Sequence, residues 1–590
     1  MGLSEKFNQL QSKYTFLETY PKAKLYTYIR ESLTGFLSRC ATPAVWCYGS
    51  HTRMLMADFI FEMKKVKFII DGKYEQADAG GFCVIHEDRI LECGIDGIVI
   101  SSYQYREEIR AALKEKYAHI KYLDFYEELE NQGILLNGAY YTGSHPYASY
   151  KKINRIKRRL RNNEKTEELL QSLIREYVNI RDFQSAARYA EALVLMGDYP
   201  LYRELKQDLE EIYQLELSTL SSVSAGHTVL FCMDGLRRQD VLNDSMPRLK
   251  QYLTEYTHFY TNAYSVSTST YESLIPAYGE NDDLRTKYYI SNTVPEKDCR
   301  FIREAVKQGR GIHFYTDSTK YVESDRIQVT ELIQTATEKI WDFIMDADVD
   351  KEGLFYVHVL YESHYSYPNP DTESELIADG TNIMFDYLER NGGRLRTDYE
   401  RQHRDTVQYL DRVITPFLRV LPCRMVFYAD HGNILLPPGM PLDEIAAANF
   451  SCHEDLIQIP MAIRSPEMPV VTDDSLISLM DFNEIVCSLL YKQRFEYEPK
   501  HFIKIQRSAI YNPDFQYIYH KAGKDQELKA FETFIFENGY KLTVYEDGFV
   551  RLCDRLDEPV EDQGKAPDLW NKVYKHITVT DRPLHSLQES

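Results

Sequence analysis

The sequence contains no apolar run long enough to cross a membrane as a helix. Its most apolar stretches, 94–101 and 354–360, fall well short of the ~20 residues that a span requires. Residues 1–6 show no apolar signal-peptide core. The ten cysteines include no Cys-x-x-Cys pair, which argues against both a disulfide framework and a zinc finger. We therefore expect a soluble protein in the reducing cytoplasm.

Basic residues are also fewer than acidic residues. Lys and Arg number 69 against 90 Asp and Glu, so the formal net charge is -21. Such a chain is a poor general binder of nucleic acids or anionic membranes, because affinity for phosphate grows with the number of basic contacts. What is present is a globular composition, with 44% hydrophobic and 27% charged residues. A chain of 590 residues is too long for one core, so several domains are expected.

The first part of the chain predicts a small α/β domain. Residues 1–40 have helical periodicity, and strands then alternate with helices through residues 41–149, which predicts a parallel sheet. This part resembles the Rossmann-like domains of enzymes that handle sugars and nucleotides. Gly49 and Asp71 stand where such domains contact pyrophosphate and ribose, but the other two glycines of G-x-G-x-x-G are missing. A structural or docking domain that has lost its nucleotide site is the favoured interpretation, and nucleotide binding is the alternative.

Two further segments flank the most informative region. Residues 150–222 are helical throughout and resemble tetratricopeptide-like hairpins, so we expect a helical spacer. A protein partner could bind this spacer or the N-terminal part. Residues 501–590 are β-rich, and the Asn538-Gly539 pair between two apolar runs predicts a hairpin. We expect a small antiparallel subdomain there.

Between them, residues 223–500 contain two buried strands that end in acidic residues. The strand 227–233 precedes Asp234, and the strand 424–429 precedes Asp430, His431 and Gly432. Carboxylates at strand ends of α/β sheets point into the crevice where ligands bind, although such residues also cap helices. Adjacent Asp and His offer one oxygen and one imidazole nitrogen, a pair that suits Zn²⁺ or Mn²⁺.

A hydroxyl-rich segment, 265–273, precedes an apolar helical stretch. Ser and Thr are preferred as helix N-caps, so the segment could be structural. It could equally supply a nucleophilic hydroxyl beside helix N–H groups that can hold a phosphate. The acidic strand ends favour the second interpretation.

In this order, Asp234, the threonine cluster, Asp430-His431 and His453 resemble the sulfatase-like branch of the alkaline phosphatase superfamily. The pattern extends over roughly residues 226–500 and is similar to that of phosphoethanolamine transferases and lipoteichoic acid synthases. The resemblance implies an alkaline phosphatase-like α/β/α sandwich. It also implies a divalent metal, Zn²⁺ or Mn²⁺ first and Mg²⁺ or Ca²⁺ as alternatives, bound by Asp234, Thr270, Asp430 and His431.

The same resemblance assigns roles to further residues. Thr270 would be the nucleophile, because a Ser follows three residues later as in the family, and Thr268 is the reserve candidate. His364 and His453 would contact the phosphoryl group or protonate the leaving oxygen. The remaining substrate contacts would come from Arg237, Thr268 and Ser273.

The departures from the family narrow the function. The transferases carry Glu where this chain has Asp234, and the Cys/Ser-x-Pro-x-Arg signature of true sulfatases is absent, which argues against sulfate-ester hydrolysis. The transferases' membrane helices are also absent. We expect a soluble metal-dependent phosphotransferase that moves a phosphoethanolamine- or phosphoglycerol-type group to a glycan or another alcohol through a phospho-threonine, as in polysaccharide biosynthesis. A phosphodiesterase or phosphatase with the same site, and a non-catalytic scaffold, are the alternatives.

Overall fold

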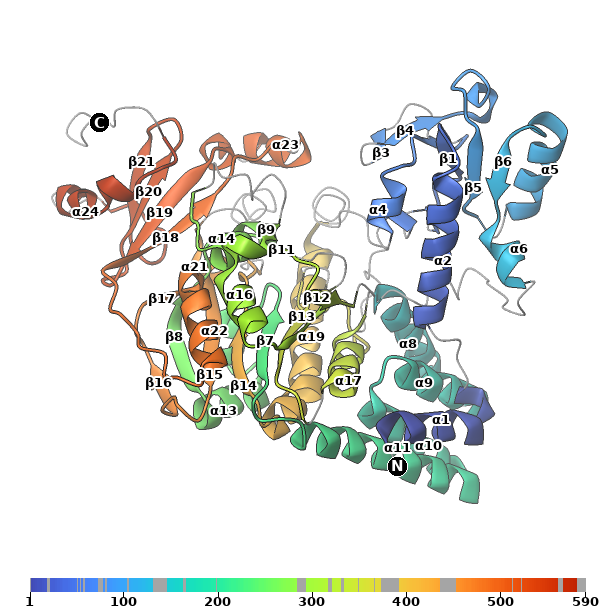
Figure 1. Ribbon diagram of the computed structural model, residues 1–590, viewed down its shortest axis with the longest axis horizontal. Coiled ribbons are helices and arrows are strands. Elements are labelled where there is room, and N and C mark those ends of the chain that lie inside the picture. Colours follow the sequence, from blue (N-terminus) through green and yellow to red (C-terminus); the bar gives the residue numbers. More distant parts are fainter. Residues whose placement is uncertain are drawn as a thin grey trace.

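The structure is a computed structural model in which four units follow one another (Figure 1). A small α/β unit and a group of helices lie on one side, a large α/β unit lies in the centre, and a small β-sheet carries the C-terminal part. The structure describes residues 2–17, 22–49, 51–52, 55–56, 59–72, 78–79, 82–102, 105–130, 146–162, 166–197, 199–283, 293–316, 321–330, 334–347, 350–364, 367–372, 392–435, 452–511, 513–521, 523–560 and 566–580.

The N-terminal segment 1–40 is divided between two units. Helix α1 (Leu3–Lys13) and the turn η1 (Thr15–Leu17) pack on the helical spacer, where Lys6 pairs with Asp208 at 3.3 Å. Helix α2 (Lys22–Leu37) packs instead on the α/β unit that follows. The α/β unit is therefore inserted between two parts of the helical layer.

The inserted unit, for which the sequence predicts a Rossmann-like domain, contains a mostly parallel sheet. In its described residues, strands run in the order β3-β4-β2-β1-β5-β6, parallel except for β3. Asp71 follows β2, and its carboxylate accepts a hydrogen bond of 2.8 Å from the Tyr48 N–H. The elements are β1 (Pro43–Trp46), α4 (Ile60–Met63), β2 (Phe68–Ile70), β3 (Asp78–Ala79), β4 (Phe82–Ile85), η2 (Glu87–Arg89), β5 (Gly97–Ile100), α5 (Arg106–Lys116), β6 (Lys121–Leu123) and α6 (Phe125–Glu130).

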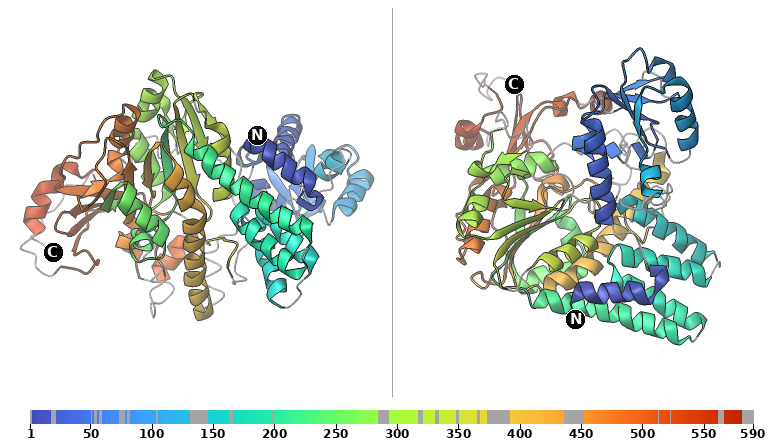
Figure 2. Two further views of the ribbon diagram at one scale, coloured as in Figure 1. Left: turned by 90° about the horizontal axis from the view of Figure 1, so that it is seen from below. Right: turned by 45° about the vertical axis from the view of Figure 1, so that its right-hand side comes forward.

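The spacer consists of helices that pack side by side in chain order (Figure 2). Polar side chains cap two of them: Thr166 accepts from the Leu169 N–H at 3.2 Å, and Asp182 accepts from the Ser185 N–H at 2.9 Å. The last helix leads directly into the central sheet. The helices are α8 (Pro146–Arg161), α9 (Glu167–Asn179), α10 (Phe183–Met196) and α11 (Pro200–Ser221).

The central unit is an α/β/α sandwich, as predicted. Its sheet has the strand order β12-β10-β13-β7-β14-β15-β8-β16. The neighbouring strands β12, β10, β13, β7 and β14 are parallel. Strand β15 pairs antiparallel with both β14 and β8, and β17 also pairs with β8. The strands of this unit are β7 (Thr228–Met233), β8 (His258–Tyr264), β10 (Gly311–Tyr315), β12 (Ile327–Val329), β13 (Gly353–Val359), β14 (Arg424–Tyr428), β15 (Gln458–Arg464), β16 (Val471–Asp473), β17 (Ile477–Ser478) and the separate pair β9 (Val294–Pro295) and β11 (Val322–Glu323).

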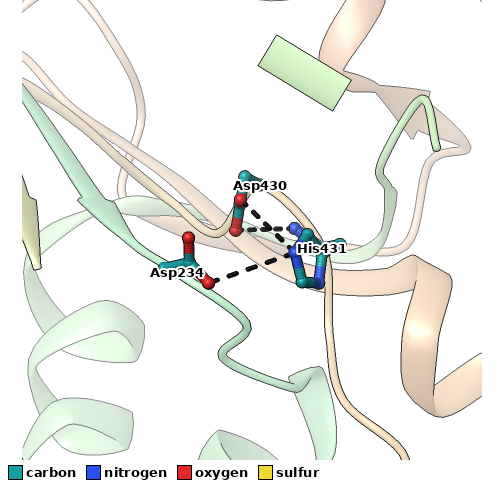
Figure 3. A group of neighbouring side chains, drawn as sticks. All are labelled: Asp234, Asp430 and His431. Carbon is teal, nitrogen blue, oxygen red and sulfur yellow. Dashed lines mark hydrogen bonds and ion pairs between the residues drawn. The ribbon is translucent and has the colours of Figure 1, made fainter. Parts of the chain in front are cut away.

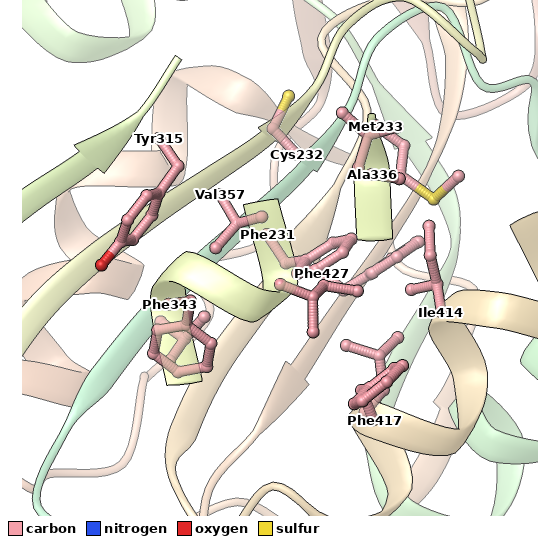
Figure 4. Packing of buried hydrophobic residues seen from close by; sticks show 14 of the residues in the cluster. Phe231, Cys232, Met233, Tyr315, Ala336, Phe343, Val357, Ile414, Phe417 and Phe427 are labelled. Carbon is pink, nitrogen blue, oxygen red and sulfur yellow. The ribbon is translucent and has the colours of Figure 1, made fainter. Parts of the chain in front are cut away.

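Helices cover both faces of this sheet because its central strands are apolar on both sides. On one face, Phe231 and Phe427 stack at 5.9 Å and meet side chains of α17 and α19 such as Phe343 and Phe417 (Figure 4). On the other face, Tyr428 packs on Phe482 of α22 at 4.8 Å. The helices are α12 (Arg238–Leu242), α13 (Pro247–Tyr256), α14 (Thr270–Gly279), η3 (Glu296–Asp298), α16 (Arg300–Lys307), α17 (Ala336–Asp346), α19 (Gly392–Val420), α21 (Glu454–Ile457), η4 (Leu479–Asp481) and α22 (Phe482–Leu490).

The C-terminal part is an antiparallel sheet in the order β18-β19-β20-β21. The predicted hairpin is confirmed: β19 and β20 pair from Phe531 with Tyr545, and Gly539 turns the chain with φ +84. Its elements are β18 (Phe502–Arg507), α23 (Pro513–Lys521), η5 (Asp525–Leu528), β19 (Phe531–Phe536), β20 (Lys541–Tyr545), β21 (Val550–Cys553), α24 (Ala566–Val573) and η6 (Tyr574–His576). Across the described residues, no helix combines the length and apolarity that a membrane crossing needs.

Candidate active site

Two neighbouring strands bring the predicted acidic residues together. Strands β7 and β14 are parallel and in register from Thr228 with Arg424 to Cys232 with Tyr428. Because the two strands are parallel and in register, they end at the same edge of the sheet. Asp234 and the Asp430-His431 pair follow directly at that edge.

The three side chains form one compact cluster (Figure 3). One ligand atom from each lies within 4.8 Å of the other two. His431 Nε2 is 3.6 Å from Asp430 Oδ2 and 4.0 Å from Asp234 Oδ1. All three residues are buried, so their charges are poorly screened by water.

The donor set fits a divalent metal. Asp234 Oδ1 and Asp430 Oδ2, the two oxygens that face His431, have no hydrogen-bond partner in the described part of the chain. Buried carboxylates without partners are strongly unfavourable unless a cation compensates them. His431 Nδ1 lies 2.7 Å from the Gly432 carbonyl oxygen, and this contact leaves Nε2 as the ligand atom.

The electrostatics of the cluster also favour a cation. Burial raises the pKa of Asp430, and the nearby Asp234 carboxylate raises it further. Burial acts in the same direction on Asp234, but the surrounding imidazoles of His364, His358 and His431 outweigh it and lower its pKa. For His431 the two carboxylates overcome the effect of burial and raise the pKa. The cluster thus stabilises positive charge at its centre.

Thr270 completes the group of predicted metal-binding residues. It is the first residue of α14, and its hydroxyl donates a hydrogen bond of 3.0 Å to Asp234 Oδ2. The Thr270 hydroxyl oxygen also lies 3.3 Å from His431 Nε2. The N-cap Ser269 makes no side-chain capping bond to α14. The hydroxyl therefore stands at a helix N-terminus, where backbone N–H groups favour an anion.

The match to known families agrees with this arrangement. Residues 227–490 match the protein-family model described as Sulfatase, a range that contains every residue of the cluster. Residues 227–490 form a sulfatase-like domain. This domain accordingly belongs to the sulfatase-like class of enzymes, whose members bind a divalent metal. No curated protein sequence matches the chain significantly.

Solved structures are similar to part of this chain at low identity. A putative sulfatase from Bacteroides thetaiotaomicron is 10% identical with a TM-score of 0.40, covering 60% of this chain and 95% of its own. A phosphonate monoester hydrolase from Silicibacter pomeroyi is 11% identical with a TM-score of 0.43, covering 59% and 94%. The zinc complex of the periplasmic domain of EcEptC from Escherichia coli is 15% identical with a TM-score of 0.33, covering 46% and 83%.

The other hydroxyls of the sulfatase-like domain's threonine segment differ from Thr270. Thr268 is buried, and its hydroxyl has no hydrogen-bond partner among the described residues. Ser273 is fully buried and donates to the Ser267 carbonyl at 3.2 Å. Ser273 thus shapes the segment that carries Thr270, and its predicted substrate contact stays a prediction.

Of the three predicted basic residues, His364 lies near the cluster, whereas His453 and Arg237 have partners within the protein. His364 lies close enough to Asp234 to lower its pKa. His453 caps α21, where its Nδ1 accepts from the Asp455 N–H at 3.2 Å. Arg237 is paired with Asp240 at 2.5 Å and with Asp455 at 3.4 Å. Its guanidinium already has carboxylate partners, so a contact with phosphate stays a prediction.

The sequence interpretation missed His358. This residue lies on β13, fully buried, with Nε2 3.6 Å from Asp234 Oδ2. Neither ring nitrogen has a hydrogen-bond partner in the described residues. A polar residue within an otherwise apolar strand was the available signal.

The C-terminal sheet is attached to two segments of the site. The Gln506 N–H donates to the Val266 carbonyl at 2.9 Å, beside the threonine segment. Lys541, which is buried on β20, donates to the Cys452 carbonyl at 2.9 Å and pairs with Glu454 at 3.1 Å. The two contacts of Lys541 thus flank His453, because they are made with the residues directly before and after it.

Proposed function

We propose that the sulfatase-like domain transfers a substituted phosphate to an alcohol acceptor through a phospho-threonine at Thr270. One observation carries this proposal: the Thr270 hydroxyl lies at a helix N-terminus, 3.0 Å from Asp234 and 3.3 Å from His431. A nucleophile, its activating ligands and backbone donors for a phosphoryl oxygen thus converge on one point.

The chain's residues support a two-step reaction. The Thr270 hydroxyl passes its proton to Asp234 Oδ2, its hydrogen-bond acceptor at 3.0 Å, and its oxygen forms a new P–O bond. The bond to the donor's leaving oxygen breaks at the same time, and that oxygen takes a proton from an imidazole. In the second step the acceptor hydroxyl gives its proton to the same imidazole and displaces Thr270, which recovers its proton from Asp234. His364 is favoured for this role because of its proximity to Asp234. A metal held by Asp234, Thr270, Asp430 and His431, with Zn²⁺ or Mn²⁺ favoured, would supply Lewis-acid stabilisation of the developing charge.

Phosphate is favoured over sulfate by the nucleophile itself. The formylglycine of true sulfatases is made from Cys or Ser within Cys/Ser-x-Pro-x-Arg, and this chain has Thr270-Tyr-Glu-Ser instead. An unmodified threonine hydroxyl suits a reaction with a covalent phospho-enzyme. A glycan acceptor is the finer part of the proposal, supported by the Rossmann-like unit, which is of a kind found in enzymes that handle sugars.

Intact-mass measurement tests the nucleophile. The purified protein, loaded with Zn²⁺ or Mn²⁺, is incubated with glycerophosphoethanolamine or with bis(p-nitrophenyl) phosphate. We expect a mass increment in the wild type and in Thr270→Ser, and none in Thr270→Ala. The matched control is Thr268→Ala, which should keep the increment. An increment that persists in Thr270→Ala and disappears in Thr268→Ala would refute the assignment.

A phosphodiesterase or phosphatase shares the first step, and product analysis separates the two reactions. Added glycerol or an oligosaccharide should yield a new phosphodiester if the enzyme is a transferase. Release of only the free phosphate compound, at every acceptor concentration, would establish hydrolysis instead.

A further inference from the structure

The segment that carries His364 is held by a helix from outside the sulfatase-like domain. Helix α8 of the spacer lies between the Rossmann-like unit and the helices α9 to α11 (Figure 1). The chain that follows β13 contains two described stretches, 360–364 and 367–372, which we call the His364 segment. The contacts between α8 and this segment join residues that are more than 200 positions apart in the sequence.

The first contact lies two residues before His364. Glu362 is fully buried, and its Oε1 accepts hydrogen bonds of 2.7 Å from the Tyr150 hydroxyl and 2.7 Å from the Ala336 N–H. Burial raises the pKa of Glu362. A buried carboxyl is tolerated only where donors compensate it, so the position of Glu362 depends on these two groups.

The second group of contacts lies after His364. Asn154, which is fully buried, donates to the Asn369 carbonyl at 2.8 Å. Lys157 donates to the Pro370 carbonyl at 2.9 Å and pairs with Asp371 at 2.5 Å. One helix therefore holds the segment by hydrogen bonds both before and after His364.

The three donors share one face of α8. Tyr150, Asn154 and Lys157 stand at i, i+4 and i+7, the spacing that places side chains on one face of a helix. Arg155, on another face, is exposed. Lys157, one of the basic residues of this helix, is thus directed to the catalytic unit.

The His364 segment is also linked through Val359 to Asp234 of the candidate metal site. The Val359 carbonyl, at the end of β13, accepts from the Asp234 N–H at 3.0 Å and from the Ser363 hydroxyl at 3.1 Å. On the other side, the Tyr367 N–H donates to the His364 carbonyl at 2.9 Å. The backbone around His364 is fixed from the metal side by β13 and from the opposite side by α8.

We propose that Tyr150, Asn154 and Lys157 of α8 are positioning residues that set the place of His364 in the active site. The inference rests on the proposed function, in which His364 moves a proton. It means that the catalytic geometry is completed by the spacer, which lies outside residues 227–490. The mechanism is directional hydrogen bonding, which fixes both the position and the orientation of the segment.

Tyr150→Phe is the sharpest test, because it removes one hydroxyl and keeps the buried ring. With bis(p-nitrophenyl) phosphate as the probe, we expect kcat to fall about 10-fold while the KM and the metal affinity stay within about twofold. Glu362→Gln, which keeps an acceptor oxygen, should retain more activity than Glu362→Ala. The matched control on the exposed face, Arg155→Met, should behave as the wild type.

A double-mutant cycle separates positioning from general loosening. If Tyr150 acts through His364, then Tyr150→Phe should have no further effect on kcat in the His364→Ala background. Independent, multiplicative effects of the two substitutions would overturn the proposal. So would an unchanged kcat in Tyr150→Phe, or a loss of metal affinity that parallels the loss of kcat.

Hydrogen–deuterium exchange provides a readout that does not need activity. Amides of the His364 segment should exchange faster in Tyr150→Phe and at the wild-type rate in Arg155→Met. An unchanged rate in Tyr150→Phe would overturn the proposal whatever the kinetics show. If the wild type turned over no phosphate ester, the proposed function would fail, and the exchange rates would still decide whether α8 holds the segment.

Discussion

The buried Lys541 and the partly buried Glu454 form an ion pair at 3.1 Å that joins the C-terminal sheet to the segment carrying His453. The ammonium group also pairs with Asp557 at 2.9 Å and donates to the Cys452 carbonyl. Burial alone would lower the pKa of Lys541, but the two carboxylates outweigh it and raise the pKa. The lysine is therefore charged and fully partnered at physiological pH.

Lys541→Met should detach this segment from the C-terminal sheet. Removing the ammonium group leaves Asp557 without its cation and Glu454 with only Arg555 at 3.5 Å, which costs about 3 kcal/mol of unfolding free energy. Denaturant unfolding measures this loss. Lys529→Met removes a more exposed pair with Asp547 and should cost less than about 1 kcal/mol. Equal losses in the two variants would contradict the structural role of Lys541.

His358 should tune the metal site without being one of its ligands. Its Nε2 lies 3.6 Å from Asp234, so His358→Phe removes a polar neighbour of a ligating carboxylate. We expect metal affinity to fall about 10- to 100-fold, measured by titration calorimetry with Zn²⁺ or Mn²⁺. The matched control is His313→Phe on the neighbouring strand β10, which should bind metal normally. Wild-type affinity in His358→Phe would refute this role.

Gly432 should tolerate no side chain. A Cβ at this position would lie 2.0 Å from the Asp455 carbonyl oxygen, so the backbone that follows Asp430 and His431 would have to move. Gly432→Ala should lose about 1–3 kcal/mol of stability and bind metal more weakly. Thermal unfolding and metal titration measure both effects. Gly49→Ala, where no atom lies within 4 Å, should change stability by less than about 0.5 kcal/mol.

Asp342 should make stability depend on pH. Burial raises its pKa from 3.8 to about 6, so the folded state binds its proton more tightly than the unfolded state does. Its contribution is fully present below the unfolded pKa of 3.8 and is lost as the pH rises through about 6. Relative to the wild type, Asp342→Asn should gain about 2–3 kcal/mol between about pH 4 and about pH 7.

Urea unfolding of both proteins across this pH range measures the gain at Asp342. The exposed Glu255→Gln serves as the control for a change of net charge, and its stability difference from the wild type should stay constant. A difference between Asp342→Asn and the wild type that does not vary with pH would contradict the raised pKa.

Strand ends were the part of the site that the sequence could predict. Asp234 and Asp430 follow uninterrupted apolar runs, and parallel neighbouring strands bring their ends to one edge whatever the loops between them do. The C-terminal hairpin was predictable because an Asn-Gly turn between apolar runs is a local signal, whereas the sandwich was predicted from the resemblance to a known family. These features need no knowledge of side-chain packing.

The missed features depend on contacts between distant segments. His358 sits within an apolar strand, and only the pairing of β13 with β7 places it beside Asp234. The hydrogen bond between Tyr150 and Glu362 joins positions 212 residues apart, and no spacing pattern in the sequence predicts such a pair. The division of segment 1–40 likewise follows from tertiary packing, because both of its helices are amphipathic and neither shows which unit it joins.

The insertion of the Rossmann-like unit between α1 and α8 has a consequence for biosynthesis. Lys6 and its partner Asp208 are 202 positions apart, so the first helix leaves the ribosome long before the surface that receives it. At about 5–20 residues per second, its apolar side chains wait about 10–40 s for that surface to be made. The Rossmann-like unit is complete within that interval. The first helix of the chain therefore docks only after the Rossmann-like unit that follows it in the sequence has been made.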